Sequence, residues 1–243
     1  MRMLVFARRC TREILRDPIN LFFGLGFPVV LLLLLSAIQA NIPVPLFEIS
    51  HLAPGIAVFG LSFMTLFSAT LISRDREDAL LQRLYATPLR ASDFILGYML
   101  SLLPMTLLQC AVCYLVAALL GLPLNSRILC GIVAVLPIAG FYLGLGLLCG
   151  SVLNSKQVGG ICGALLTNLS AWLSGVWFDL ELLGENFGKV ADLLPFVHAV
   201  ELERAVIRGA LTDIWPHLWV VVAYGAAVTA GAVLLFLRRM RHL

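Results

Sequence analysis

Cysteine and histidine are the residues of this sequence best suited to metal binding or nucleophilic chemistry. Cys110 and Cys113 form a C-x-x-C pair, but the pair lies inside an apolar run with no histidine nearby. The other cysteines are spread along the chain, at Cys10, Cys130, Cys149 and Cys162. A thiol in an apolar run behaves as a small hydrophobic side chain. The pattern therefore favours packing over a metal or redox role, and no metal site is expected.

The positions of the histidines disfavour hydrolytic chemistry inside a membrane. His51, His198, His217 and His242 all lie in loops or at the ends of apolar runs. A serine or metal mechanism at membrane depth would need a histidine there. The sequence also contains no G-x-x-x-x-G-K-[ST], the phosphate-binding loop of many ATPases. We therefore expect no catalytic residue in this chain.

The composition is typical of an integral membrane protein. Hydrophobic residues make up 60% of the 243 residues, charged residues make up 13%, and the mean hydropathy is +0.97. Soluble proteins carry about 25% charged residues. Since a spanning helix needs about 20 apolar residues, the apolar runs predict one all-α domain, 1–243, with six transmembrane helices. These are approximately 21–40, 55–73, 94–120, 128–153, 158–178 and 215–237.

The distribution of charge predicts the topology. With the N-terminus placed in the cytoplasm, thirteen of the seventeen Lys and Arg residues fall on the cytoplasmic side. The other four are Arg127, Lys189, Arg204 and Arg208, and the acidic residues lean the opposite way, six against eight. The positive-inside rule then selects six spans with both termini in the cytoplasm. We expect a multi-pass protein of the cytoplasmic (inner or plasma) membrane.

Residues 1–18 are basic and amphipathic. Leu4, Ala7, Thr11, Ile14 and Leu15 recur at helical spacing, and the arginines gather on another face. This pattern predicts a helix lying in the membrane interface, which ends at Asp17-Pro18 because the residue before proline is restricted. The alternative is a signal peptide cleaved after Ala40. It is disfavoured because this region contains Glu13 and Asp17 and the apolar run has the length of a span.

A charged stretch, residues 74–92, separates the second and third predicted spans. Arg74, Asp75, Arg76, Glu77, Asp78 and Arg83 open it, and Thr87-Pro88 breaks it. Leu80, Leu81, Leu84 and Tyr85 fall on one side of a short helix. A short cytoplasmic helix at the membrane surface would be a docking element for a partner. The alternative is a solvated loop that only connects two spans.

Polar and aromatic side chains concentrate in the second and fifth predicted spans. They are Phe59, Ser62, Phe63, Thr65 and Phe67 in the second, and Thr167, Asn168 and Trp172 in the fifth. They are candidates for a substrate path or a subunit interface. Asn168 could line a path or bond across a helix interface, and the second interpretation is favoured slightly.

The predicted spans contain no Asp, Glu, Lys or Arg. Carriers driven by protons or ions usually keep an ionisable group in the membrane, so the energy for any transport should come from another protein. The fourth span carries Gly140, Gly144, Gly146 and Gly150 in two G-x-x-x-G repeats, and Gly160 follows in the fifth. Such spacing favours close helix packing, although chance is an equal explanation for any single pair.

The segment 179–213 is too apolar for a free loop. Leu193, Leu194, Phe196 and Val200 recur in it, with Pro195 placed where a helix could begin and Gly209 where one could end. We expect short external helices between the fifth and sixth spans, partly re-entrant and enclosed by protein.

Motifs spread along the whole chain resemble those of the membrane subunit of ABC-2 type ABC transporters, the type V exporter architecture. They are Arg16-Asp17-Pro18 before a span with Pro28, Arg76-Glu77 through Arg83-Leu84 and Thr87-Pro88-Leu89 followed by Gly97, Leu173-Ser174-Gly175, and Leu194-Pro195. The chain departs from the family pattern at Ala79-Leu80, where the family has Gly-Thr, at Tyr98, where it has Lys, and at Phe178-Asp179, in place of Phe-x-Pro.

The resemblance implies a mechanism. Two six-span permease subunits, identical or homologous, would pair in the lipid membrane with spans two and five near the dimer axis. Each would dock on a separate ATPase subunit that binds ATP and Mg²⁺, so this chain would bind no cofactor directly, and no nucleic acid is expected. The residues implied in coupling are Arg76, Glu77, Leu80, Leu81, Arg83, Leu84 and Tyr85. The apolar, uncharged spans favour export of a lipophilic substrate, a drug-like compound or a lipid, over ions, and glycan-linked lipids and peptides remain open. The alternative is an ATP-independent channel or a scaffold.

Overall fold

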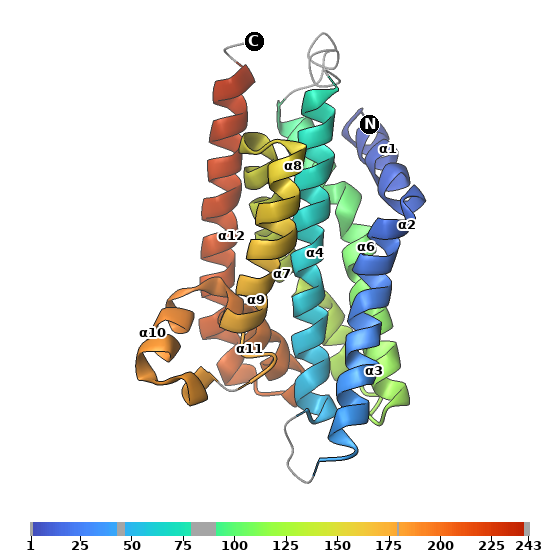
Figure 1. Cartoon of the computed structure of the whole chain (residues 1–243), viewed down its shortest axis with the longest axis vertical. Coiled ribbons are helices and arrows are strands. Elements are labelled where there is room, and N and C mark those ends of the chain that lie inside the picture. The colour runs from blue at the N-terminus through green and yellow to red at the C-terminus, as the bar shows by residue number, and fades with distance from the viewer. Residues whose placement is uncertain (1, 43–46, 79–90, 179, 241–243) are drawn as a thin grey trace.

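Six helical legs run along the long axis of an elongated bundle (Figure 1). The computed structural model describes residues 2–42, 47–78, 91–178 and 180–240. Within these ranges the chain is helical and contains no strand. The legs in chain order are α2 (Pro18–Leu21) with the π-helix η1 (Phe22–Gly26) and α3 (Phe27–Gln39), then α4 (Ile49–Glu77), α6 (Ala91–Leu119), α7 (Ser126–Val152), α8 (Ser155–Val158) with the π-helix η2 (Gly159–Leu166) and α9 (Thr167–Leu173), and α12 (Leu211–Met240).

The remaining helices lie at the two ends of the bundle. α1 (Arg2–Arg16) lies at the end where both termini are found, which is the upper end of Figure 1. The short 3₁₀-helix η3 (Leu180–Leu183), α10 (Glu185–Leu193) and α11 (Pro195–Arg208) lie at the opposite end. Both termini share one end because an even number of legs connects them.

Five of the legs are long and apolar enough to cross a membrane. They are Pro18–Gln39, Ile49–Glu77, Asp93–Leu119, Ser126–Val152 and Leu211–Leu235. The predicted fifth span, 158–178, is not among these five. Its helical run, Ser155–Leu173, contains Lys156, Gln157 and Asn168, which lower its hydropathy. The structure therefore confirms an all-helical protein with five candidate membrane spans in its described part, and a sixth span is not confirmed.

Local sequence signals explain several helix ends. α1 ends at Arg16, and the Asp17 carboxylate accepts hydrogen bonds from the backbone N–H groups of Ile19 and Asn20, which caps α2. The predicted boundary at Asp17-Pro18 is confirmed. α11 begins at Pro195 as predicted and ends at Gly209, whose φ of 79° lies in the left-handed region that glycine adopts without strain.

α4 is longer than the sequence predicted. The second span was expected to end at Ser73, with Arg74 opening a separate charged element. Instead α4 continues without interruption to Glu77, so the first charges of that element belong to the end of α4 itself. The remainder of the predicted docking helix, 79–90, lies outside the described residues.

α4 is the most deeply buried leg, and α7 packs against both α4 and α12. The glycines of α7 permit this close approach. A Cβ added at Gly146 would lie 2.6 Å from the Thr65 backbone oxygen of α4, and one at Gly144 would lie 2.5 Å from Thr229 Oγ1 of α12. Gly140 and Gly160 have open space instead, so the expected packing role is wrong for them within the described chain.

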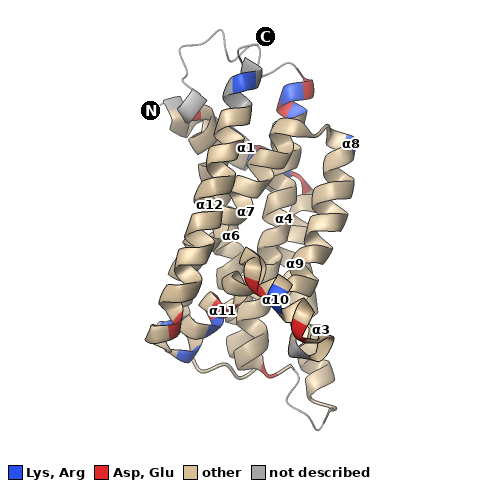
Figure 2. Ribbon diagram, turned by 90° about the vertical axis from the view of Figure 1, so that its left-hand side faces the viewer, with Lys and Arg blue, Asp and Glu red and all other residues tan. Residues whose placement is uncertain are grey.

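The described charged residues gather at the two ends of the bundle, and the middle is almost free of them (Figure 2). Exposed hydrophobic side chains cover the legs, among them Leu33, Leu115, Leu129 and Leu234. A band of apolar surface between two charged ends is the surface expected of a protein surrounded by lipid.

Candidate functional site

An aromatic groove opens between the first leg, α4 and the leg formed by α8, η2 and α9. Its volume is about 500 Å³. Phe63 is the centre of its aromatic wall, with ring centroids at 5.8 Å from Phe23, 5.5 Å from Phe27 and 5.8 Å from Phe59. Trp177 closes one end by an edge contact with Phe59 at 5.5 Å. Such a groove can hold an apolar or aromatic molecule.

Five of the eight candidate path residues line this groove. They are Phe59, Phe63, Thr167, Asn168 and Trp172. The sequence missed Phe23, Phe27, Trp177 and Phe178, which also line it. Phe23 and Phe27 come from the first leg, and their spacing of four residues was a usable signal that they share a helix face.

The other three candidates do not line the groove. Thr65 Oγ1 donates a hydrogen bond to the Tyr142 backbone oxygen of α7 at 2.8 Å. Ser62 and Phe67 are buried inside the bundle. These three side chains belong to the packing of α4 against its neighbours.

Asn168 is the most polar side chain of the groove. Its Nδ2 donates a hydrogen bond to the Ala164 backbone oxygen one turn earlier at 2.8 Å. The sequence slightly favours a hydrogen bond from Asn168 to another helix. In the described chain its partner, Ala164, lies on the same leg. Thr167 Oγ1 likewise donates to the Cys162 backbone oxygen at 3.0 Å. Both side chains satisfy a donor locally and keep oxygen lone pairs for another group.

Arg76 and Glu77, two of the predicted coupling residues, join the end of α4 to the connection between α7 and α8. Arg76 donates to the backbone oxygens of Gly150 at 2.9 Å, Leu153 at 3.2 Å, and Ser151. Glu77 accepts from the Ser155 N–H at 2.8 Å and its hydroxyl at 2.7 Å. The cation thus meets the carbonyls at the end of α7, and the anion meets the N–H and hydroxyl of Ser155 at the start of α8.

The other predicted coupling residues, Leu80, Leu81, Arg83, Leu84 and Tyr85, lie outside the described residues. The structure places only the base of the coupling region, where α4 ends at Glu77 and Asp78 follows.

A buried carboxylate that the sequence did not single out lies beside this base. Asp75 accepts two hydrogen bonds from Arg9 of α1, both at 3.0 Å, and one from the Tyr98 hydroxyl of α6 at 2.8 Å. Leu71 and Ile72 are buried on the same face of α4, and this shared face was the signal that Asp75 points inward.

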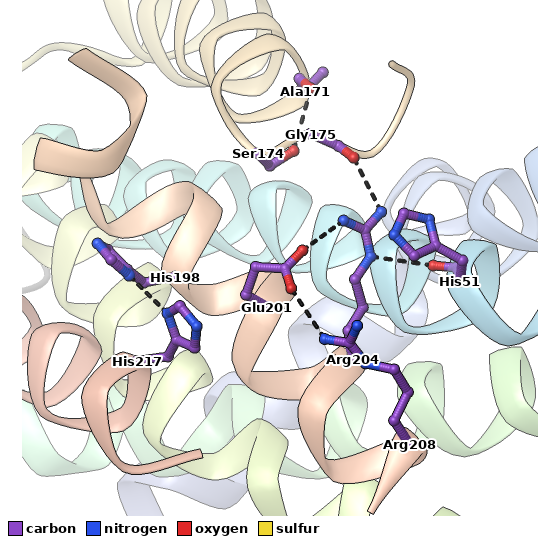
Figure 3. A network of polar contacts seen from close by, with 9 residues as sticks. All are labelled: His51, Ala171, Ser174, Gly175, His198, Glu201, Arg204, Arg208 and His217. Atoms are coloured by element: carbon purple, nitrogen blue, oxygen red, sulfur yellow. Dashed lines mark hydrogen bonds and ion pairs between the residues drawn. The ribbon is translucent and has the colours of Figure 1, made fainter. Parts of the chain in front are cut away.

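The opposite end of the bundle also buries charge. Arg204 of α11 donates to the backbone oxygens of Gly175 at 2.9 Å and His51 at 3.3 Å, and to Glu201 at 2.8 Å (Figure 3). Arg208 also donates to Glu201, at 3.2 Å. This network joins α11 to α4 and to the end of α9, so the segment expected as external helices is held firmly against the legs.

Glu203 is fully buried between α11, α6 and α7. The Tyr114 hydroxyl donates to its Oε1 at 2.6 Å, and a Cβ at Gly131 would lie 2.9 Å from the same oxygen. Burial raises the pKa of Glu203 to about 8, against a smaller lowering by the Tyr114 hydrogen bond. The predicted spans contain no acidic residue, but this acid from α11 lies against two of them.

The six cysteines are free thiols. Within the described residues, His, Cys, Asp and Glu form no group of three that could hold a metal ion. The described site offers a groove that can hold an apolar molecule and a charged network at each end of the bundle.

Comparison with known proteins agrees with this geometry. The ABC-2 type transporter family matches residues 2–207. Nodulation protein J of Bradyrhizobium diazoefficiens is 25% identical over 232 residues, which cover 93% of this chain and 85% of that protein. ABC transporter G family member 20 of Dictyostelium discoideum is 27% identical over 177 residues, 71% of this chain but only 24% of that protein. The chain belongs to the ABC-2 type transporter family and is a membrane-spanning permease subunit of an ABC transporter.

Proposed function

We propose that this permease exports a lipophilic substrate, a drug-like compound or a lipid, across the cytoplasmic membrane. Two permease subunits, identical or homologous, form the path, and each docks on a separate ATPase subunit that binds Mg²⁺ and hydrolyses ATP. The chain forms a single domain. Its fifth leg, Ser155–Leu173, also spans the membrane, which brings the number of spans to six. Both termini face the cytoplasm.

The observation that carries the substrate class is the aromatic groove. The rings of Phe23, Phe27, Phe59 and Phe63 pack against one another along it, and Trp172 and Trp177 complete the wall. Among the described residues that line it there is no Asp, Glu, Lys or Arg. A charged molecule would lose its hydration there without gaining a counter-ion, whereas an apolar body would gain contact area.

The arrangement of the legs supports a sixth span. Both described chain ends lie at the same end of the bundle, and the Ser155–Leu173 leg lies alongside α4 (Figure 1). Its polar residues need not face lipid. Lys156 and Gln157 lie in the first turn of this leg, where they can reach the interface, and Asn168 faces the groove.

The base of the coupling region supports the docking role. Arg76 and Glu77 tie the end of α4 to the α7–α8 connection. A push on residues 79–90 would therefore act on two neighbouring connections of the permease at once. The fifth leg, which lines the groove, begins at this connection with α8, so movement there would reach the groove.

The experiment is reconstitution of the permease with its ATPase in lipid vesicles, with ATP hydrolysis and substrate efflux measured together. We expect the permease to change the rate of ATP hydrolysis by the ATPase, and lipophilic compounds to stimulate that hydrolysis. Glu77→Ala and Arg83→Ala should uncouple hydrolysis from efflux. Glu185→Ala, which removes a carboxylate of an exposed ion pair in α10 at the other end, is the matched control and should leave coupling intact.

Unchanged coupling in both Glu77→Ala and Arg83→Ala would contradict the docking role. An ATPase that neither associates with the permease nor responds to it would contradict the exporter and favour the channel or scaffold. Stimulation by charged solutes in place of lipophilic ones would contradict the substrate class alone.

A further inference from the structure

Two histidines face each other where α11 meets α12. His198 Nδ1 lies 2.8 Å from His217 Nδ1, and His198 Nε2 lies 2.8 Å from the Asp192 backbone oxygen at the end of α10 (Figure 3 shows the two rings). The ring centroids are 5.1 Å apart and the rings are tilted by 41°. A direct Nδ1–Nδ1 contact requires one donor and one acceptor, so the two rings cannot have the same arrangement of protons.

The backbone oxygen of Asp192 fixes which ring donates. A carbonyl oxygen only accepts, so His198 Nε2 must carry a hydrogen. A neutral His198 then has a bare Nδ1, and His217 Nδ1 must donate to it. If one proton is added, His198 donates from both nitrogens and His217 changes tautomer, so the contact survives. A second proton places two N–H groups against each other, and the contact cannot survive.

A second proton would place two positive charges on adjacent rings, so it binds less readily than the first. The charged groups that act on His217 are Glu201 and Arg208 of α11 and Asp213 of α12. Asp192 stands at the end of α10. Two other helices bring a charged residue to the end of the bundle that holds α11. Arg127 of α7 donates to the Arg208 backbone oxygen, and Glu48 lies at the start of α4.

We propose that His198 and His217 form an acid-sensitive latch between α11 and α12, which holds through the uptake of one proton and opens on uptake of the second. Within the described ranges a second side-chain bond also joins α12 to this region, from the Tyr224 hydroxyl to the Leu193 backbone oxygen at 2.6 Å. The Tyr224 bond joins a hydroxyl to a backbone oxygen and contains no imidazole, so acid breaks the first bond and leaves the second.

The elements that the latch holds also form a polar cavity. Asp192 of α10 and Val197 and Glu201 of α11 line it, and its volume is about 370 Å³. When the contact with His217 breaks, His198 stays bound to the Asp192 oxygen and Tyr224 stays bound to the Leu193 oxygen, so the end of α10 remains on α12 and the start of α11 is released from it. This links an acidic medium at that end of the bundle to the position of α11, which supplies Val197 and Glu201 to the cavity wall. Its consequence for transport, a pH-dependent release step, rests on the proposed export function.

The direct test is nitrogen NMR of histidine-labelled permease in lipid nanodiscs, without any ATPase. Four histidines keep the spectrum assignable by substitution. We expect the hydrogen on Nε2 of His198 and on Nδ1 of His217 at pH 8, and an abrupt change of both signals when the pair takes up its second proton as the sample is acidified. A His217 ring that carries its hydrogen on Nε2 at pH 8 would overturn the proposal.

Thermal unfolding gives the second readout. His217→Asn keeps a donor in the Nδ1 position and removes the second protonation. We expect the Tm of the wild type to fall between pH 7 and 5 by about 3 °C more than that of His217→Asn. His51→Gln, on α4, is the matched control and should keep the wild-type profile. If His217→Asn does not fold, His198→Asn is measured in its place. Parallel wild-type and His217→Asn profiles would overturn the latch, whereas failure of ATPase coupling would affect only the export function.

Discussion

Arg9 and Asp75 form a doubly hydrogen-bonded ion pair although 66 positions separate them. Each guanidinium nitrogen lies 3.0 Å from one carboxylate oxygen. The Asp75 side chain is 3% exposed and that of Arg9 is 40% exposed, so the carboxylate lies inside the bundle and the guanidinium reaches it from the edge. Because a buried carboxylate requires donors, this pair fixes α1 against α4 at the base of the coupling region.

Asp75→Asn should therefore destabilise the permease and loosen α1. The amide cannot accept both nitrogens of Arg9 and the Tyr98 hydroxyl as the carboxylate does. We expect a loss of about 1–3 kcal/mol in the free energy of unfolding, measured by thermal unfolding in detergent. Glu13→Gln is the control, because Glu13 binds Arg9 at 2.9 Å but is 42% exposed, and its loss should stay below about 1 kcal/mol. Equal losses would contradict the role of burial.

Gly146 and Gly140 lie in the same helix and offer a matched pair of substitutions. A Cβ at Gly146 would meet the backbone of α4, whereas a Cβ at Gly140 has no heavy atom within 4 Å. Gly146→Ala should lower the free energy of unfolding by about 1–3 kcal/mol because α4 and α7 must separate. Gly140→Ala should be neutral or slightly stabilising because alanine favours the helix. A destabilised Gly140→Ala variant would show that this face packs against another molecule.

The parts of the fold that the sequence could predict are those that local chemistry decides. Proline at Pro18 and Pro195 and glycine at Gly209 restrict the backbone wherever they occur, so the helix ends beside them were predictable. Long apolar runs identified five legs. Hydropathy is weaker for the Ser155–Leu173 leg because part of its surface faces other helices and the groove, where polar residues such as Asn168 are tolerated.

The candidate site was predictable only in part. Phe59 and Phe63 lie one turn apart and line the groove, but Thr65, two residues on, lies on another face of α4 and bonds to α7. The sequence predicted which residues lie in the second span. It could not predict which side of that helix faces the groove and which faces α7, because this depends on tertiary packing. The same is true of Arg9–Asp75 and Tyr114–Glu203, whose partners are distant in sequence.

Glu203 should make stability fall as the pH rises. Its pKa is about 8 in the folded protein, against about 4.3 in an unfolded chain. Between these values the folded state binds more protons than the unfolded state, so the contribution of Glu203 is fully present below about pH 4.3 and is lost by pH 8. Glu203→Gln removes this titration and keeps an acceptor for Tyr114. We expect the Tm of Glu203→Gln to rise relative to the Tm of the wild type as the pH increases from 5 to 8.

The measurement is the difference in Tm between wild type and Glu203→Gln at each pH, so that titrations shared by both proteins cancel. Converted to a free energy of unfolding, this difference should change by no more than about 1.4 kcal/mol per pH unit. Its sign is opposite to that of the His198–His217 latch, which loses stability toward acid. A difference that does not change with pH would show that Glu203 is ionised in the folded state.

Trp172 tests whether the groove binds the transported molecule. Its side chain is 56% exposed and lines the groove, while Leu165, 55% exposed on the same leg, does not line it. Both substitutions to alanine should leave stability nearly unchanged because neither side chain is buried. Trp172→Ala should raise the concentration of a lipophilic compound needed for half-maximal ATPase stimulation by about tenfold, as expected for the loss of 1–2 kcal/mol of aromatic contact. Leu165→Ala should leave that concentration unchanged. If both variants respond like the wild type, the groove is not the binding site, and if both lose stimulation, the exposed face of this leg acts as a subunit interface instead.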